Sequence, residues 1–259
     1  MKKIVIVMTY FERQEQLNKT LRSIVKSGYA NYEIVVVDDG SQYFPYIYEM
    51  NKKITVLHTE RKVWTNPEPA YNIGIYYAML QSPDIIILQN AECYHVNDIL
   101  FYANQHLRDD NYISFSCFSI DKQNTFANHD ITALLQAHEY GASMDGQVAW
   151  YNHPRYRPVG YDFCSAISAE NMRKLNGYDE RLSDGCGYGD DYLLQRIKML
   201  GLKVQIPEPP APFVVHQWHY NTKTPDNKSQ LVEKNRILYH ELLKENNYKA
   251  VHKYTTDLL

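Results

Sequence analysis

The sequence predicts an α/β fold in which helices flank a doubly wound, mostly parallel central sheet. Two observations predict this class. Short continuous segments rich in Ile and Val, typical of strands covered on both faces, alternate with longer segments whose apolar residues recur at helical spacing. The alternation extends over residues 1–118, and strands that alternate with helices usually pair in parallel. A chain of 259 residues is long enough for one large domain of this kind.

The first half of the chain contains four predicted strands and three predicted helices. In the first helix Leu17, Leu21 and Ile24 recur at helical spacing, and Gly28 is a typical stop signal after it. The strands are expected at 3–9, 33–38, 54–58 and 85–89, and the helices at 14–26, 69–81 and 96–108.

The second half is less regular. Over residues 119–160 Asn, Gln, His and Gly are scattered among aromatic residues, which predicts a long irregular insertion of the kind that carries specificity. Regular patterns then return. The expected order is a strand at 163–168, a helix at 169–175, a glycine-rich loop at 177–189, a helix at 190–200, a proline-rich connector at 207–212, a strand at 213–216 and a helix at 229–245.

Composition excludes several classes of protein. The net charge of −3 provides no global field for nucleic acid, so no nucleic-acid partner is expected. The apolar segment after Lys3 is too short for a signal peptide, and no segment approaches the roughly 20 apolar residues of a transmembrane helix. The four cysteines are widely separated, which is typical of buried free thiols. We therefore expect a cytoplasmic protein, with membrane contact only through its substrate.

Polar residues follow several predicted strands, where ligands bind in open α/β sheets. They are Thr9-Tyr10, Asp38-Asp39, Asn90 with Glu92, and His216. The acidic pair has two interpretations, because Asp-Gly makes a turn and a carboxylate also accepts hydrogen bonds from a nucleotide base or ribose. The first strand is followed by TYFERQEQ, which has no G-x-G-x-x-G motif, so a dinucleotide-dependent oxidoreductase is disfavoured.

Two long stretches carry a more specific signal. TYFERQEQLNKTLRSIVKSGYANYEIVVVDDGS resembles the opening of glycosyltransferase family 2, the inverting enzymes of the GT-A fold. SAISAENMRKLNGYDERLSDGCGYGDDYLLQRIKMLG resembles a C-terminal galactosyltransferase-type segment. The resemblance implies transfer of a sugar from a nucleotide-diphosphate sugar, above all a UDP-sugar such as a UDP-galactose-like donor. The acceptor would be a glycan, glycolipid or glycoprotein.

The resemblance also divides the chain by role. Residues 1–118 would form the nucleotide-sugar-binding half, 119–228 the acceptor-binding and catalytic half, and 229–259 a helical tail. Asn72 with Gly74 matches the family's N-x-G helix start, whereas a solvated charged segment explains Arg61-Lys62 equally well. The residues implied in donor binding are Thr9, Tyr10, Arg13, Asp38, Asp39, Arg61, Asn66, Asn72 and Asn90.

A metal site is implied where the family has an Asp-x-Asp motif. Here the chain has Asn90-Ala91-Glu92, and alternate strand residues face the same side. Mn²⁺ or Mg²⁺ would bind Asn90, Glu92 and His216, with His219 as the second choice of histidine. One carboxylate fewer predicts weaker binding. The alternative is that Asn90 is a turn residue and Glu92 an acid at a helix start.

The catalytic base is implied in the acidic pair after the glycine-rich loop. The resemblance assigns the base to Asp191 and acceptor binding to Asp190, whereas acids in a first helical turn are also simply favoured by the helix dipole. Two rival functions remain at this stage. A nucleotidyltransferase is disfavoured because TYFERQEQ has no glycine, and a degenerate, glycan-binding relative is supported by the asparagine at position 90.

Overall fold

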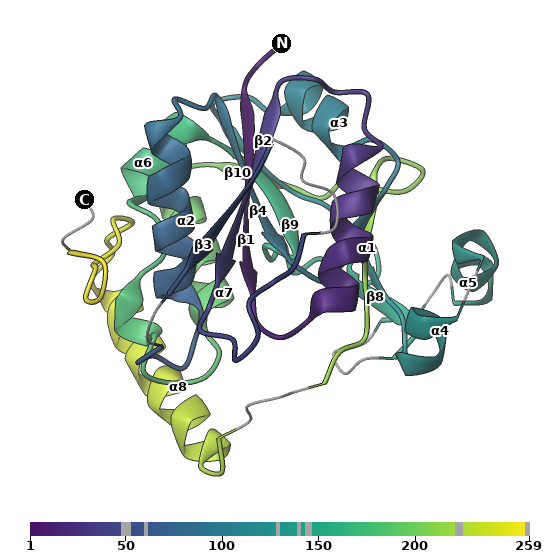
Figure 1. The fold of residues 1–259 in the computed structure, drawn as a ribbon. Helices are drawn as coiled ribbons and strands as arrows, with labels where there is room; N and C mark the ends of the chain where they lie inside the picture. The colour runs from purple at the N-terminus through teal and green to yellow at the C-terminus, as the bar shows by residue number, and fades with distance from the viewer. Residues whose placement is uncertain are drawn as a thin grey trace.

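A computed structural model describes residues 1–47, 53–59, 62–127, 130–138, 141–142, 147–220 and 225–256. Its centre is a seven-stranded sheet with the order β10-β6-β9-β4-β1-β2-β3 (Figure 1). The strands are β1 (Ile4–Tyr10), β2 (Tyr32–Asp38), β3 (Ile54–His58), β4 (Ile85–Asn90), β6 (Asn111–Ser114), β9 (Cys164–Ser168) and β10 (Lys203–Gln205). Only β9 runs antiparallel to its neighbours, so the predicted doubly wound, mostly parallel sheet is confirmed.

Helices cover both faces of this sheet. The helices are α1 (Gln14–Val25), α2 (Glu68–Leu80), α3 (Ile99–His106), α6 (Ala169–Leu175), α7 (Gly189–Met199) and α8 (Lys228–Lys244), with a short 3₁₀ turn at Glu180–Leu182. In Figure 1, α1 and α3 lie on one side and α2, α6 and α7 on the other. In β1, Ile4 and Ile6 pack toward α1 and α3, whereas Val5 and Val7 pack toward α2, α6 and α7. Burial on both faces explains why the strand is continuously apolar.

A second, four-stranded sheet was not predicted. Its order is β5 (Cys93–Val96), β11 (Phe213–His216), β7 (Cys117–Ser119) and β8 (Ala149–Asn152). The segment between β7 and β8, expected to be irregular, also contains α4 (Lys122–Phe126) and α5 (Ile131–Ala137). Only β11 was predicted as a strand; the other elements are short, and the strands pair with partners far away in sequence, so local periodicity does not reveal the sheet.

The helix expected at 96–108 begins later than predicted. Val96 ends β5, and Asn97 has a left-handed φ of 63°, which interrupts helical geometry. Asp98 then caps α3 by accepting a hydrogen bond from the backbone N–H of Phe101. A strand and a capped helix therefore replace the start of one long helix.

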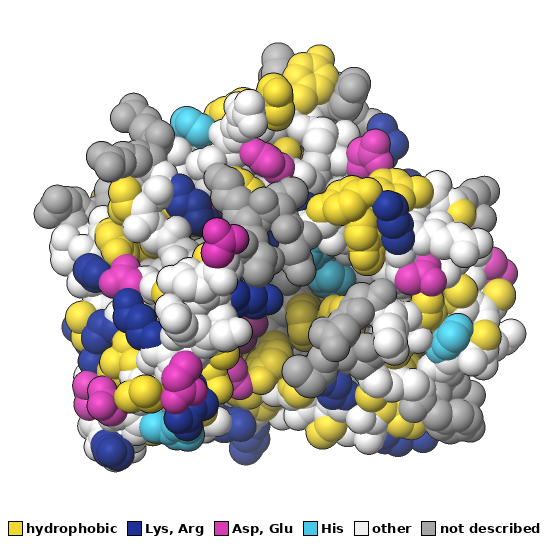
Figure 2. Space-filling view, turned by 90° about the horizontal axis from the view of Figure 1, so that it is seen from below, with side chains coloured by type: hydrophobic (Ala, Val, Ile, Leu, Met, Phe, Trp, Pro, Cys, Tyr) yellow, Lys and Arg dark blue, Asp and Glu magenta, His cyan; other side chains and the backbone are white. Residues whose placement is uncertain are grey.

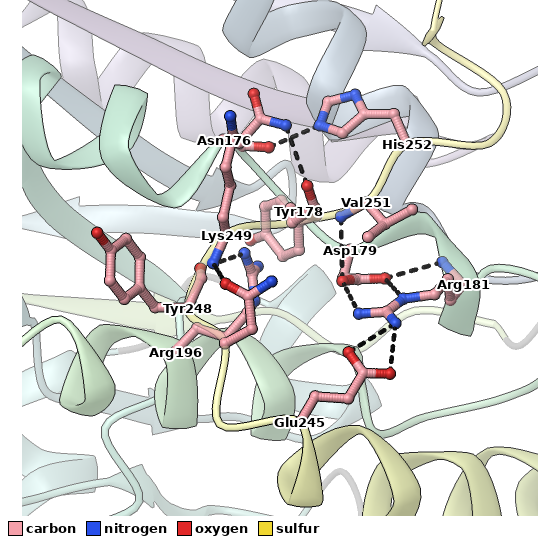
Figure 3. Close-up of polar contacts among 12 residues, drawn as sticks. Asn176, Tyr178, Asp179, Arg181, Arg196, Glu245, Tyr248, Lys249, Val251 and His252 are labelled. Carbon is pink, nitrogen blue, oxygen red and sulfur yellow. Dashed lines mark hydrogen bonds and ion pairs between the residues drawn. The ribbon is translucent and has the colours of Figure 1, made fainter.

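The chain after α8 returns to the main domain through buried polar contacts (Figure 3). Asp179 accepts hydrogen bonds from the side chain of Arg181 and from the backbone N–H of Val251. Arg196, which is fully buried, donates to the carbonyls of Leu175 and Tyr248. The segment is thereby attached to the first part of the glycine-rich loop and to α7. None of the helices in the described ranges has the length and apolar character needed to cross a membrane.

Candidate active site

A cleft lies at the carboxyl ends of the parallel strands, the edge where α/β sheets bind ligands. Figure 2 looks onto this edge and shows a hollow near its centre, where hydrophobic, basic and histidine side chains meet. The cleft consists of two adjoining cavities of about 390 and 360 Å³, which we name after Asp39 and Glu92. Both cavities share Thr9, Arg13, Asn66, Pro67 and Gly187.

Three potential metal ligands meet in the Glu92 cavity. Nε2 of His216 lies 3.4 Å and Nε2 of His219 lies 3.5 Å from Oε1 of Glu92. The ligand atoms of the three residues all lie within 4.8 Å of one another. Antiparallel pairing of β11 with β5 sets His216 opposite Cys93, which places the histidine beside Glu92. The second sheet, which the sequence did not reveal, therefore assembles this cluster.

Charge in the cavity keeps Glu92 ionised. Burial alone would raise the pKa of this carboxyl, but Arg13, whose Nη1 lies 2.8 Å from Oε1, holds the pKa well below its usual range, with help from a hydrogen bond with His216. Burial lowers the pKa of His219 to about 4, so its imidazole is neutral at pH 7. An ionised carboxylate and a neutral imidazole are the forms that bind a divalent ion.

The cluster contains two of the expected ligands, Glu92 and His216, and adds His219. Asn90 lines the same cavity, where its Oδ1 accepts a hydrogen bond of 3.0 Å from the hydroxyl of Tyr71. His219 was expected only as an alternative to His216, but the two histidines lie side by side in the cluster. The residues fit a divalent cation, because Oε2 of Glu92 is buried without a hydrogen-bond partner in the described part of the chain.

Three further carboxyl groups border the Glu92 cavity, and two of them, Glu68 and Asp162, were missed from the sequence. Burial, together with the nearby charge of Asp190, raises the pKa of Glu68 to about 8, so Glu68 is mostly protonated at pH 7. Burial also raises the pKa of Asp162 well above its usual range, and the hydroxyl of Tyr178 donates to this carboxyl. In sequence, Glu68 has the signal of an ordinary first-turn acid, and no local signal identifies Asp162.

The acidic pair at the start of α7 is split between two environments. Asp190 lines the Glu92 cavity, and its side chain is in contact with the solvent there. The cavity walls exclude part of the water around the carboxyl group, and this desolvation, together with the charge of Asp191, raises its pKa to about 6. Asp191 instead accepts a hydrogen bond from the hydroxyl of Tyr161 and does not line the cavity. Consecutive helical residues point about 100° apart, so only one of the two faces the cleft. The base implied by the resemblance was Asp191, whereas Asp190 is the residue in the cleft.

The two aspartates after β2 are also separated. Asp38 is fully buried, and its oxygens lie 3.1 Å from the backbone nitrogen of Ser41 and 2.7 Å from Nδ1 of His58. Asp39 lines the Asp39 cavity, where Nε1 of Trp64 donates to it over 2.7 Å and Lys62 forms an ion pair with it. Burial raises the pKa of Asp39, although Lys62 opposes the shift. Asp39 is thus the acid in a position to meet a ligand.

The remaining residues implied in donor binding fall into three groups. Thr9, Arg13 and Asn66 line both cavities, and Tyr10 lines the Asp39 cavity. Asn66 also exchanges hydrogen bonds of 3.0 and 3.1 Å with the backbone of Gly187, which ties the segment before α2 to the glycine-rich loop. Asn72 is buried behind the cleft, where its amide donates to the carbonyl of Tyr178 and to Glu180. Arg61 lies outside the described residues.

This fold and this cleft are those of an α/β protein that binds its ligand at the carboxyl ends of its parallel strands. The chain belongs to glycosyl transferase family 2, whose sequence profile matches residues 4–167, and it is a glycosyltransferase, as predicted. No curated protein is similar enough in sequence to count as a match.

Similar solved structures confirm the GT-A fold. The catalytic domain of Drosophila beta1,4galactosyltransferase 7, in complex with xylobiose, has a TM-score of 0.54 and 16% identity over 91% of this chain and 81% of that chain. TarS residues 1–349 from S. aureus, in complex with UDP, have a TM-score of 0.60 and 10% identity over 97% and 67% of the two chains. A mannosyltransferase from Pyrobaculum calidifontis, in complex with GDP-Man and Mn²⁺, has a TM-score of 0.53 and 14% identity over 96% and 66%.

Proposed function

We propose that this glycosyltransferase moves a sugar from a UDP-sugar to a hydroxyl of a glycan, glycolipid or glycoprotein, with inversion at the anomeric carbon. The observation that carries the proposal is the Glu92 cavity itself. The Glu92–His216–His219 cluster and the Asp190 carboxyl both line this cavity of about 360 Å³. A cation site and a base in one cavity are what a single displacement needs, because one acts on the leaving diphosphate and the other on the attacking hydroxyl.

The donor nucleotide is assigned to the Asp39 cavity. The Asp39 carboxylate can accept hydrogen bonds from a base N–H or a ribose hydroxyl. Contacts with Lys62 and Trp64 hold this carboxylate in place. Lys228 also lines this cavity and supplies a positive charge for phosphate. The UDP complex of the similarly folded TarS supports a uridine nucleotide.

The leaving group is assigned to the boundary between the two cavities. Glu92, His216 and His219 would hold the metal ion, and two nitrogen ligands favour Mn²⁺ over Mg²⁺. When bound, a divalent ion offsets the negative charge that develops on the departing diphosphate. Arg13 lines both cavities, so its guanidinium is in a position to contact the same diphosphate.

Asp190 is assigned the role of general base. A pKa of about 6 leaves this carboxyl mostly ionised at pH 7 and makes it a stronger base than an ordinary aspartate. It would take the proton of the acceptor hydroxyl as the oxygen attacks the anomeric carbon. Glu68, held mostly protonated by burial and by the charge of Asp190, adds little charge that would compete for that proton.

The proposal is tested by incubating the protein with UDP-, GDP-, dTDP- and CMP-sugars, with Mn²⁺ or with excess chelator. We expect UDP release only from UDP-sugars, dependence on Mn²⁺, and a product of inverted anomeric configuration by NMR. Full turnover in chelator would contradict the metal assignment. Tight nucleotide-sugar binding without any turnover would instead identify a binding module, and release of pyrophosphate from a nucleoside triphosphate would identify a nucleotidyltransferase.

A further inference from the structure

The largest described cavity that shares no residue with the catalytic cleft lies between α1 and β5, and its volume is about 480 Å³. We name it the α1–β5 cavity. One wall comes from α1 and the other from β5 and the turn that leads to α3. The lining residues on which the argument depends are Lys19, Arg22, Lys26, Tyr94, His95 and Asp98.

Three cations form one wall of the cavity. Lys19 and Arg22 of α1 and Lys26, the residue that caps its C-terminus, are spaced at i, i+3 and i+7, which places them on one side of the helix. None of the three forms an ion pair with a carboxylate of the described residues. The dipole of α1 favours cations in its last turn, which accounts for Arg22 and Lys26 but not for Lys19 in the middle of the helix.

Lys19 has the most unusual environment of the three. Its Nζ lies 4.6 Å from the centre of the Tyr94 ring, and burial lowers the pKa of its ammonium. An ammonium removed from water without a carboxylate partner costs free energy that an anion in the cavity would recover.

The opposite wall offers little negative charge. Among the residues that the structure describes, Asp98 is the only acid that lines the cavity. Both of its oxygens accept from the hydroxyl of Ser27 at 2.8 Å, and Oδ1 also caps α3. Burial lowers the pKa of His95 to about 3, so this imidazole is neutral. The cavity therefore has three positive side chains and one negative side chain that is already hydrogen-bonded.

We propose that the α1–β5 cavity binds a phosphate group of a phosphorylated ligand, separately from the nucleotide sugar. An arginine fork and two ammonium groups are the donors that recognise phosphate, and a cavity of about 480 Å³ has the size of a small-molecule site. The proposed transfer reaction does not require this site. The phosphate could belong to a soluble phosphorylated compound or to a lipid headgroup, and the two sources are separated by experiment.

The test uses amide NMR shifts of the whole protein during titration with inorganic phosphate, in the presence of saturating UDP. We expect shifts at the amides of Ser23 and His95, and the triple variant Lys19→Gln/Arg22→Gln/Lys26→Gln should weaken phosphate binding by about tenfold or more. The matched control is Lys174→Gln/Lys198→Gln/Lys203→Gln, which removes the same charge elsewhere and should bind phosphate normally. Glutamine is a good helix former, so α1 should remain intact.

Two results would overturn the proposal: phosphate shifts confined to cleft amides such as those of Thr9 and Asn66, or equal weakening in both triple variants. Co-sedimentation with phosphatidylglycerol vesicles, compared with phosphatidylcholine vesicles, identifies the source of the phosphate. Vesicle binding lost only in the α1 variant indicates a lipid headgroup, and binding of inorganic phosphate alone indicates a soluble ligand. Failure of UDP to bind the unmodified protein would contradict the proposed function but not this site.

Discussion

A Cβ atom on Gly189 would lie 2.1 Å from Oε1 of Glu68, so the first residue of α7 packs directly against a buried carboxyl group. This contact joins the glycine-rich loop to the start of α2 beside the residue proposed as the base. Any side chain at position 189 must displace Glu68 or move α7.

We expect Gly189→Ala to lower both the melting temperature and the transfer rate, because Asp190 moves with the start of α7. Overpacking of this kind typically costs about 1–3 kcal/mol. The matched control is Gly28→Ala, where the nearest atom to a new Cβ is 3.6 Å away, and this change should be tolerated. Calorimetry and a transfer assay on both variants measure the difference. A Gly189→Ala protein with unchanged stability and rate would show that the contact is unimportant.

Glu68 should make stability depend on pH in the direction opposite to an ordinary acid. The pKa of Glu68 is about 8 in the folded state and about 4.3 in the unfolded state. The contribution of Glu68 to the free energy of unfolding is therefore fully present below the unfolded pKa and is lost as pH rises toward 8. Glu68→Gln should remove this decline of the free energy of unfolding with pH, because glutamine has nearly the same shape and can still form hydrogen bonds but does not ionise. Urea unfolding of both proteins between pH 5 and pH 8.5 measures it, and parallel pH profiles would contradict the prediction.

Replacing Asp190 by Asn should lower transfer roughly 10²–10⁴-fold, which is the usual contribution of a general base. In the unmodified enzyme the rate should rise with pH through about 6, because the base acts only when deprotonated. Asp191→Asn should have a much smaller effect, and neither variant should change UDP affinity. A larger loss of transfer rate in Asp191→Asn than in Asp190→Asn would assign the general base to Asp191.

Glu92→Gln and His219→Ala should each weaken Mn²⁺ binding by about tenfold or more, measured by electron paramagnetic resonance titration. Asn90→Asp should strengthen binding by adding a negative charge near the cluster. Tyr71→Phe is a useful companion, because it frees Oδ1 of Asn90 from its hydrogen bond. Unchanged Mn²⁺ affinity in His219→Ala, with a loss in Asn90→Ala, would favour the ligand set expected from the sequence.

Asp39→Asn should weaken UDP binding by about tenfold, because a carboxylate that faces the nucleotide loses its charge. Asp38→Asn should instead lower the melting temperature, since this fully buried carboxyl is paired with His58 inside the fold. Isothermal titration with UDP and thermal unfolding separate the two effects. A loss of UDP affinity in Asp38→Asn at unchanged stability would assign the nucleotide contact to that residue.

Much of this protein could be predicted from short stretches of its sequence. The segment EIVVVDDGS predicts a buried strand and a polar turn because the relevant interactions are local: apolar burial on both faces and the turn geometry of Asp-Gly. The parallel sheet follows from the regular alternation of strands and helices. The sequence also predicts that one acidic pair follows a strand and the other begins a helix, because each pair is adjacent in the chain to the segment that forms that element.

The tertiary structure decided which member of each pair faces the cleft. Asp190 rather than Asp191 lines the cavity because the phase of α7 is set by packing of its far side, where Leu193 and Ile197 meet the core. His219 comes beside Glu92 because β11 pairs with β5, a strand more than a hundred residues earlier in the chain. Side-chain direction depends on contacts between distant segments, and a linear pattern contains no information about those contacts.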